Sequence, residues 1–520
     1  MRSRYLLNIF FKIFPRRNTQ PPQSHTRQII RTFASLTSFP RGKTKNKPTQ
    51  WGALALAAAV TTGTSLYVIN SQKPEKNLLI GTVSKTKEKS NAQDPFTAAL
   101  NRHIQKYYGD LVLPQEVIEQ LAMFQTSTIK TSESNVRMDG KEEDNLHIEI
   151  KRSLSRWNCL HLLLQGDQKA YQNFVAHQPE AEKLSYDSFK KLAALLSKEP
   201  EVTQALAASC FIAMSDKAKT LAKEKKANFS LDSEKFLSDT IVQCPEINPI
   251  TALLSAKTKE LLPFLYLPDT HGRHMLYTEG GNNMFATMKE KLATGKLTQK
   301  QYTAWLGRWL INIAGFRGHE DPQGSIYLTE NTAKALFALN DELQLLRSNP
   351  QHDPLKGYLK TRAKWLGTSS LYLAHLGASM RLYTREDGKD LRAWFEGLPK
   401  ARQNQEEQAY EKLRKRLETT PTYEVAVLDN LRSMGCSISE TLNIHSKVSA
   451  KAALAYQEAI KQNRISSKTP LCFRDFAFKN NLQPVLESYR ANGELPEIRI
   501  DEQGNVAQER VKPVYQPKGP

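Results

Sequence analysis

The stretch TQKQYTAWLGRWLINIAGF, Thr298–Phe316, shows in one segment which fold class to expect. Thr298 and Gln301 have the spacing of a capping box, in which each side chain accepts a backbone N–H at the start of a helix. Large apolar residues then recur at i, i+3, i+4, i+7, i+8 and i+11, as on one buried face of an amphipathic helix. They are Tyr302, Trp305, Leu306, Trp309, Leu310 and Ile313. The segment predicts a long helix packed into a helical core.

Similar helix signals continue after this helix. Leucines at positions 336, 339, 343 and 346 repeat its periodicity, and Ser437 and Glu440 form a second predicted capping box. Strand signals are few. One lies in Val136–Arg152, with the turn dipeptide Asp139-Gly140 and the alternation HIEIK; another lies in Glu497–Glu509, around Gly504-Asn505. We therefore expect a mainly α body with one or two small β-hairpins.

The body is too long for one ordinary hydrophobic core. We expect two helical subdomains, at residues 95–225 and 230–490, with a boundary near the lysine-rich segment Lys217–Ser230. A hairpin and a Pro-rich tail then occupy residues 491–520. No solenoid repeat and no glycine-rich nucleotide-binding turn occurs in the chain.

The basic character of the chain is concentrated at its N-terminus. The formal net charge is +20, and residues 1–50 hold eleven Lys or Arg and no acidic residue. The first acidic residue is Glu75, so the remainder of the chain is only slightly basic. A nucleic-acid-binding domain would be expected to carry its own basic face. We therefore expect no nucleic-acid partner.

The N-terminal segment has the composition of a mitochondrial transit peptide. Residues 1–50 are rich in Ser, Thr and Arg, and RTFAS, Arg31–Ser35, resembles a site cut by the matrix processing peptidase. The other interpretation is a disordered basic tail that binds anionic lipid.

An uncharged segment follows at residues 51–70, WGALALAAAVTTGTSLYVIN. Twenty helical residues span about 30 Å, the thickness of a hydrocarbon core, so a single membrane helix is predicted; a buried globular helix is the alternative. Basic residues before the segment keep the N-terminus inside, and a polar tether at 71–94 leads to the body. This topology predicts a mitochondrial inner-membrane protein with its body in the intermembrane space, or a bacterial inner-membrane protein with a periplasmic body.

The five cysteines do not form a recognisable pattern. They stand at positions 159, 210, 244, 436 and 472, none at C-x-x-C spacing. A disulfide framework and a cysteine-based zinc site are therefore not expected, and buried free thiols are.

The segment DTHGRHMLYTEGGNNMF, Asp269–Phe285, is the first candidate site. Asp269 or Thr270 is expected to cap a short helix, which would place His271 and His274 on one side, close enough to share a metal ion. Arg273 is a candidate for binding substrate oxygens, and Glu279 for activating water. Gly280 and Gly281 would allow a close approach of the backbone to a ligand.

The segment GFRGHEDPQGS, Gly315–Ser325, is the second candidate. His319 and Asp321 are predicted metal ligands, Glu320 a second candidate catalytic base, and Arg317 a second substrate-binding residue. These roles require the two segments to meet in space. The structural alternative is a pair of crowded turns whose polar groups bond only to their surroundings.

Two further histidine positions are candidates. His352-Asp353 is followed by a proline and is expected to lie in a loop. His375, in LYLAHLGASM, is more typical of a hydrogen-bonded histidine in a helical core.

The pattern of histidines and acids over residues 265–390 resembles the HD-type metal phosphohydrolases. That resemblance implies an all-helical fold, a divalent metal and hydrolysis of a phosphorylated substrate. The chain departs from the HD pattern because its second cluster reads His-Glu-Asp. The combination of a eukaryotic-type targeting segment with a Lys- and Thr-rich helical body also resembles effector proteins of intracellular bacteria. We expect a membrane-anchored scaffold that binds a partner protein, or alternatively an HD-like hydrolase.

Overall fold

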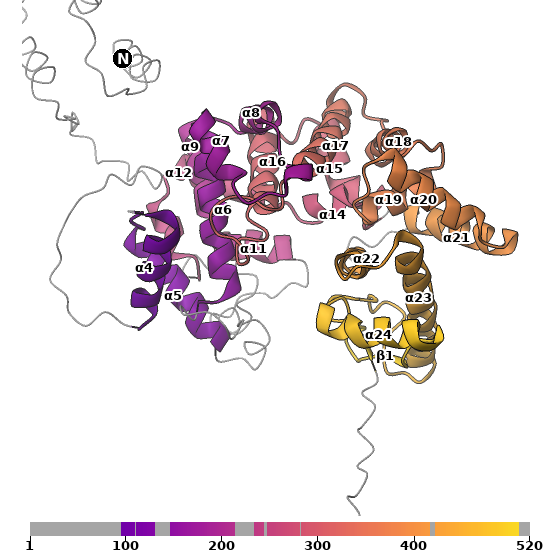
Figure 1. Cartoon of the computed structure of the whole chain (residues 1–520). Coiled ribbons are helices and arrows are strands. Elements are labelled where there is room, and N and C mark those ends of the chain that lie inside the picture. The colour runs from indigo at the N-terminus through magenta and orange to yellow at the C-terminus, as the bar shows by residue number, and fades with distance from the viewer. Residues whose placement is uncertain are drawn as a thin grey trace, which may run out of the picture. The chain divides into compact units, whose positions relative to one another are not determined.

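The computed structural model describes residues 95–109, 111–129, 146–213, 233–243, 247–280, 282–415 and 422–508 (Figure 1). Every described residue belongs to one compact unit, within Glu75–Pro520. The predicted basic segment 1–50, membrane helix 51–70 and tether 71–94 lie outside the described residues. Within the described ranges, no helix is both long enough and apolar enough to cross a membrane.

The described chain is mainly helical with two short strands, which confirms the predicted mainly α fold. Its first helices are α4 (Pro95–Tyr108), α5 (Gln115–Ile129), α6 (Ile148–Gln165), α7 (Gln168–Phe174), η2 (Glu180–Glu182), α8 (Tyr186–Leu195), α9 (Pro200–Ile212), α11 (Ser233–Gln243), η5 (Pro249–Leu253), α12 (Ala256–Lys259) and α13 (Leu262–Leu265). Then follow α14 (Gly272–Leu276), η6 (Asn282–Phe285), α15 (Ala286–Ala293), α16 (Gln299–Ala314), α17 (Glu330–Ser348), α18 (Pro354–Leu366), α19 (Leu371–Ser379), α20 (Arg385–Glu396), α21 (Lys400–Arg414), α22 (Glu424–Ser433), α23 (Ile438–Lys461), α24 (Lys479–Asn492), β1 (Ile498–Ile500) and β2 (Val506–Gln508).

The helix starts follow local sequence signals. At α16 both halves of the predicted Thr298–Gln301 capping box form, and the six residues of its apolar stripe are buried. At α23 the side chain of Ser437 accepts the N–H of Glu440, as predicted. The carboxylate of Glu440 binds the guanidinium of Arg490 at 2.7 Å. Glu440 therefore also links α23 to α24.

The predicted strand in HIEIK is wrong, because this segment begins α6. The ring Nδ1 of His147 accepts the N–H of Glu149 at 3.2 Å and caps the helix. Ile150 and Leu154, four residues apart, are both fully buried on one helical face. A five-residue alternation is too short to outweigh a cap and a buried helical face. The predicted turn Asp139-Gly140 lies outside the described residues.

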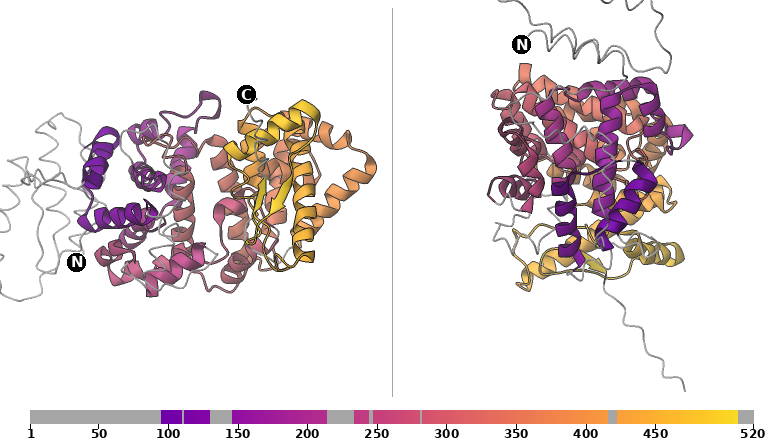
Figure 2. Two further views of the ribbon diagram at one scale, coloured as in Figure 1. Left: turned by 90° about the horizontal axis from the view of Figure 1, so that it is seen from below. Right: turned by 90° about the vertical axis from the view of Figure 1, so that its left-hand side faces the viewer.

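The predicted hairpin near the C-terminus is confirmed. β1 and β2 pair antiparallel, with Ile498 opposite Gln508 and Ile500 opposite Val506. Gly504 in the turn has a φ of +86°, a backbone conformation that side chains rarely permit. β1 packs against α23, and the two strands can be seen among the yellow C-terminal elements (Figure 2).

The buried apolar side chains form two clusters. The larger draws on helices from α4 to the start of α23, and the smaller on α22, α23, α24 and the hairpin. The predicted boundary at Lys217–Ser230 lies outside the described residues, and the larger cluster holds side chains from both sides of it. The four described cysteines are free thiols, as expected: Cys159, Cys210, Cys436 and Cys472.

Candidate functional site

The helix that carries the HGRH motif is short and begins later than predicted. α14 starts at Gly272, and its cap position is His271, not Asp269 or Thr270. The Thr270 hydroxyl instead donates to a carbonyl of its own turn at 2.6 Å and accepts the indole N–H of Trp305 at 3.0 Å. The hydrogen bond between Thr270 and Trp305 therefore connects this turn to α16.

Two glycines of this motif are required by packing. A Cβ on Gly272 would lie 2.6 Å from the ring of Trp309, and one on Gly280 would lie 2.5 Å from the side chain of Met284. Real Cβ atoms do not approach other atoms so closely, because protein interiors are close-packed. The predicted close approach of a ligand is therefore not needed to explain Gly280. Gly281 lies outside the described residues.

His274 and Glu279 form a buried pair. The Nδ1 atom of His274 is hydrogen-bonded to the carboxylate of Glu279, and both residues are less than one-tenth exposed. Burial lowers the pKa of His274, so its ring is neutral at neutral pH and Nδ1–H donates. Burial raises the pKa of Glu279, but the adjacent His274 and Arg273 outweigh it, and the net direction is downward. The pair is a neutral imidazole beside a carboxylate.

The same carboxylate reaches the start of α22. Its other oxygen accepts the backbone N–H of Tyr423, whose φ of +65° is unusual for a residue with a side chain. The Tyr423 ring meets the His274 ring edge to face at 5.5 Å, and its hydroxyl accepts from Arg474 at 2.5 Å. Glu279 therefore connects the HGRH turn to elements of the smaller core.

The polar residues of the second turn are paired with their neighbours. Arg317 binds the carboxylate of Glu320, and this bond raises the pKa of Arg317. His319 Nδ1 accepts from the guanidinium of Arg152 at 3.2 Å. The Asp321 carboxylate lies 2.5 Å from Nδ1 of His177.

The glycines of the second turn also serve packing. A Cβ on Gly315 would lie 2.6 Å from the backbone nitrogen of Arg156, and a Cβ on Gly318 would overlap the side chain of Ser155. Both contacts are with α6. The end of α16 and the RGHED turn can therefore lie directly against α6.

The two predicted turns do meet, at the ring of Phe316. The guanidinium carbon of Arg273 lies 4.2 Å from the ring centroid, and that of Arg152 lies 5.1 Å from it. The junction is therefore an aromatic ring contacted by two cations.

The candidate metal ligands fall into separate contacts. The rings of His271 and His274 are neighbours, with centroids 5.5 Å apart, as predicted. His319 bonds to Arg152 on α6, and Asp321 bonds to His177 in the turn after α7. Within the described ranges no group of three or more His, Cys, Asp or Glu residues is arranged to hold a metal ion. The assigned roles of the eight candidate residues remain predictions.

The other two histidine candidates are hydrogen-bonded. His352 Nε2 lies 2.6 Å from Glu342 on α17. His375 Nδ1 lies 2.9 Å from the hydroxyl of Thr278, directly before Glu279. Burial lowers the pKa of His375 to about 4. His375 thus supports the same HGRH turn from α19, in line with the expected core role.

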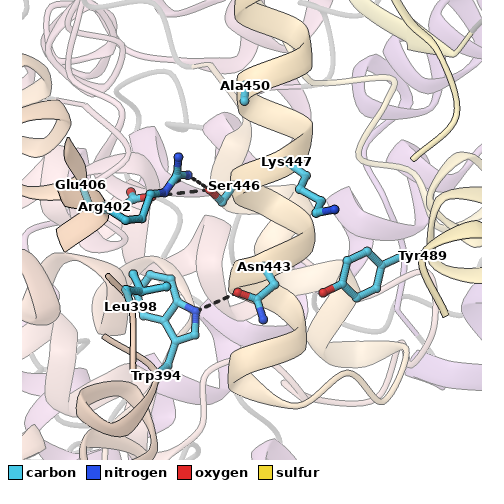
Figure 3. A pocket seen from close by; sticks show the side chains of 9 residues that line it. All are labelled: Trp394, Leu398, Arg402, Glu406, Asn443, Ser446, Lys447, Ala450 and Tyr489. Carbon is cyan, nitrogen blue, oxygen red and sulfur yellow. Dashed lines mark hydrogen bonds and ion pairs between the residues drawn. The ribbon is translucent and has the colours of Figure 1, made fainter. Parts of the chain in front are cut away.

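An open groove of about 330 Å³ lies between α20, α21, α23 and α24 (Figure 3). It is lined by Trp394, Leu398, Arg402, Glu406, Asn443, Ser446, Lys447, Ala450 and Tyr489. The α23 residues stand at positions i, i+3, i+4 and i+7, so they form one face of that helix. Trp394 and Leu398 flank this face on one side, and Tyr489 on the other (Figure 3). The groove combines an apolar wall with polar groups along its length.

Hydrogen bonds hold the walls of the groove in place. The indole N–H of Trp394 donates to Asn443 at 3.0 Å, which ties α20 to α23. Arg402 on α21 binds Ser446 on α23, and also Glu406 at 2.9 Å. The groove is thus built by side chains from separate helices.

The exposed face of α23 continues beyond the groove. Ala453 and Leu454 follow Ala450 on the same face, and Leu454 is 68% exposed. α21, by contrast, buries only Gln403 and Tyr410 along its length. The sequence reasoning missed this surface. The periodicity of α23 was visible, but its partners α20 and α24 are set by tertiary packing.

Residues 143–378 match the model of a family of unknown function (DUF6829). The match begins just before α6 and ends within α19, so it covers both candidate turns but not the groove. No curated protein and no solved structure matches the chain.

Proposed function

We propose that this chain is a membrane-anchored helical scaffold that binds a partner protein through the groove on α23. The partner segment is an amphipathic helix with an apolar face and acidic residues beside it. The observation that carries the proposal is the groove itself, with its aromatic wall and the exposed apolar continuation at Leu454. Amphipathic helices bind such grooves through apolar residues spaced at i, i+3, i+4 and i+7.

The charge on the partner follows from the lining residues. Arg402 is 40% exposed and Lys447 46% exposed, whereas Glu406 is only 20% exposed. Lys447 has a loose ion pair with Glu494, at 3.8 Å. The groove therefore presents more cationic than anionic surface, which favours an acidic partner.

The anchoring part of the proposal rests on the sequence of the N-terminal segments. Residues 1–50 and 51–70 would direct the chain to the mitochondrial inner membrane, with the body in the intermembrane space. A bacterial inner membrane with a periplasmic body is the alternative. The membrane itself is then a second partner, and no nucleic acid is involved.

A photo-crosslinking amino acid at Ala450 tests the groove. In the full chain expressed in its own cells, we expect irradiation to join one partner protein at Ala450. The same label at Asn404, which is exposed on α21 but does not line the groove, should join none. Equal adducts at both positions, or no adduct at Ala450, would overturn the proposal.

The captured partner permits a sharper test of its charge. Lys447→Glu should weaken binding of the purified partner about tenfold or more, and added salt should weaken the wild-type complex. Lys461→Glu, at the exposed far end of α23, is the matched control and should have little effect. A basic partner, or equal effects of both changes, would count against the acidic helix.

The alternative function is an HD-like, metal-dependent hydrolase of a phosphorylated substrate. One observation favours it: the rings of His271 and His274 lie side by side, as two ligands of one metal ion would. Arg273, beside the same turn, would then bind the phosphate. Metal content distinguishes this alternative from the scaffold, as described in the Discussion.

A further inference from the structure

The interface between α6 and α16 holds two buried arginines. Arg156 on α6 is 6% exposed and Arg308 on α16 is 5% exposed. The two helices pack directly against each other, and the close approach at Gly315 covers Arg156. Buried guanidinium groups require partners for their N–H groups, because they have lost those of water.

Each arginine has only one nitrogen in a recorded ion pair. Arg308 Nη2 lies 3.0 Å from Glu234 on α11. Arg156 Nη2 lies 3.5 Å from Glu149, whose other carboxylate oxygen binds Arg152 at 2.5 Å. Arg152 and Arg156 therefore share one carboxylate.

The remaining nitrogens have no hydrogen-bond partner in the described part of the chain. They are Nε and Nη1 of Arg156, Nε and Nη1 of Arg308, and Nε1 of Trp309. The rings of Tyr266 and Trp309 lie 4.3 and 4.5 Å from the Arg308 guanidinium carbon. The N–H groups of a guanidinium point outward in its own plane. An aromatic ring that contacts the flat face of the guanidinium therefore does not accept hydrogen bonds from them. Five buried donor atoms without a hydrogen-bond partner thus lie on two helices that pack against each other.

The charges around Arg156 also favour a bound anion. Burial lowers the pKa of Arg156, and repulsion from Arg152 and Arg308 adds to this effect, while Glu149 opposes it. Arg156 therefore has two other cations in its surroundings, Arg152 and Arg308. A bound anion would relieve this repulsion.

We propose that Arg156 and Arg308, with the indole N–H of Trp309, bind a phosphate group at the α6–α16 interface. Planar guanidinium groups donate paired hydrogen bonds to phosphate oxygens, and Trp adds a neutral donor. The phosphate group belongs either to inorganic phosphate or to a phosphorylated metabolite. The site lies within the residues that match the family, and its helices do not line the α23 groove.

Thermal unfolding of the full chain tests this site. Inorganic phosphate should raise the Tm of the wild-type chain by a few degrees in a saturable way, relative to chloride at equal ionic strength. Arg156→Lys and Arg308→Lys keep the charge but lose the planar donors. Each should raise the half-saturating phosphate concentration about tenfold or more. Arg490→Lys, at the half-exposed ion pair with Glu440, is the matched control and should respond as the wild type does.

A second measurement uses only the wild-type chain and tests the proposal even if the lysine variants do not fold. The purified wild-type chain is denatured in acid, and the released anions are identified by ion chromatography and mass spectrometry. Stoichiometric inorganic phosphate supports the free ion, and a stoichiometric phosphate ester supports the metabolite. No released phosphate group together with no Tm shift overturns the proposal. A Tm shift that is equal in the wild type and both lysine variants also overturns it.

Discussion

The side-chain carboxylate of Glu279 accepts the backbone N–H of Tyr423, 144 residues further along the chain. The same carboxylate binds the ring of His274. One buried acid therefore holds together the HGRH turn and the beginning of α22. This contact gives Glu279 a structural role, whether or not it also has a chemical one.

Replacing Glu279 by Ala should lower the free energy of unfolding by about 3 kcal/mol, because it leaves two buried polar groups without their partner. Urea unfolding at pH 7 measures the change. Glu320→Ala is the control, since the Glu320 carboxylate is 41% exposed in its pair with Arg317 and should cost less than about 1 kcal/mol. Equal losses in the free energy of unfolding at both positions would show that the buried contacts of Glu279 contribute no more to stability than the exposed pair of Glu320.

Stability should fall as the pH falls from about 6.5 to 4, partly because of His375. The pKa of His375 is lowered to about 4 in the folded chain, whereas an unfolded histidine titrates near 6.5. The unfolded state therefore binds its proton first, and the stabilisation present above pH 6.5 is lost on acidification. The loss from this residue is at most about 3 kcal/mol. His274, whose pKa is also lowered by burial, acts in the same direction.

His375→Gln keeps a polar group beside Thr278 but removes the titration. Urea unfolding at several pH values between 7 and 4 should give a flatter pH dependence for the variant than for the wild type. Parallel curves for the two proteins would mean that His375 is not one of the titrating groups.

The purified chain should contain no stoichiometric divalent metal, because within the described residues no three His, Cys, Asp or Glu side chains are arranged to hold one. Elemental analysis of the wild type, His274→Gln and His319→Gln measures this. Stoichiometric metal in the wild type that is lost in both variants would contradict the expectation. That result would support the HD-like hydrolase over the scaffold.

Gly315→Ala should lower the Tm, because the new Cβ would lie 2.6 Å from backbone atoms of α6 that cannot easily move. The expected cost is about 1–3 kcal/mol. Gly397→Ala is the control, since its Cβ would meet no atom closer than 3.2 Å and its backbone is helical. A wild-type Tm for Gly315→Ala would mean that α6 and α16 can separate at little cost.

Residues 1–80 fused to a fluorescent reporter should carry it to mitochondria and keep it in the membrane through carbonate extraction. The reason is the acid-free segment 1–50 followed by the uncharged segment 51–70. A fusion that replaces 51–70 with a polar linker is the control and should be released by carbonate. A cytosolic reporter, or one that carbonate releases from the intact fusion, would remove the anchoring part of the proposal.

Some features of the candidate turns could be predicted and others could not. The proximity of His271 and His274 followed from their spacing of three residues. The pairing of Asp321 with His177 and of His319 with Arg152 did not, because both partners lie far away in sequence. Gly280 was interpreted as a site of ligand approach, whereas a Cβ there would lie 2.5 Å from the side chain of Met284.

The sequence by itself determined the helical class, the capping box of α16 and the C-terminal hairpin, since each depends on residues within a few positions of one another. It was misleading at HIEIK, where a cap at His147 and burial of Ile150 and Leu154 favour a helix. Only the tertiary structure decided the Glu279–Tyr423 contact, the groove on α23 and the buried arginines. These features join segments distant in the chain, and local periodicity indicates which face of a helix is buried but not which helix covers it.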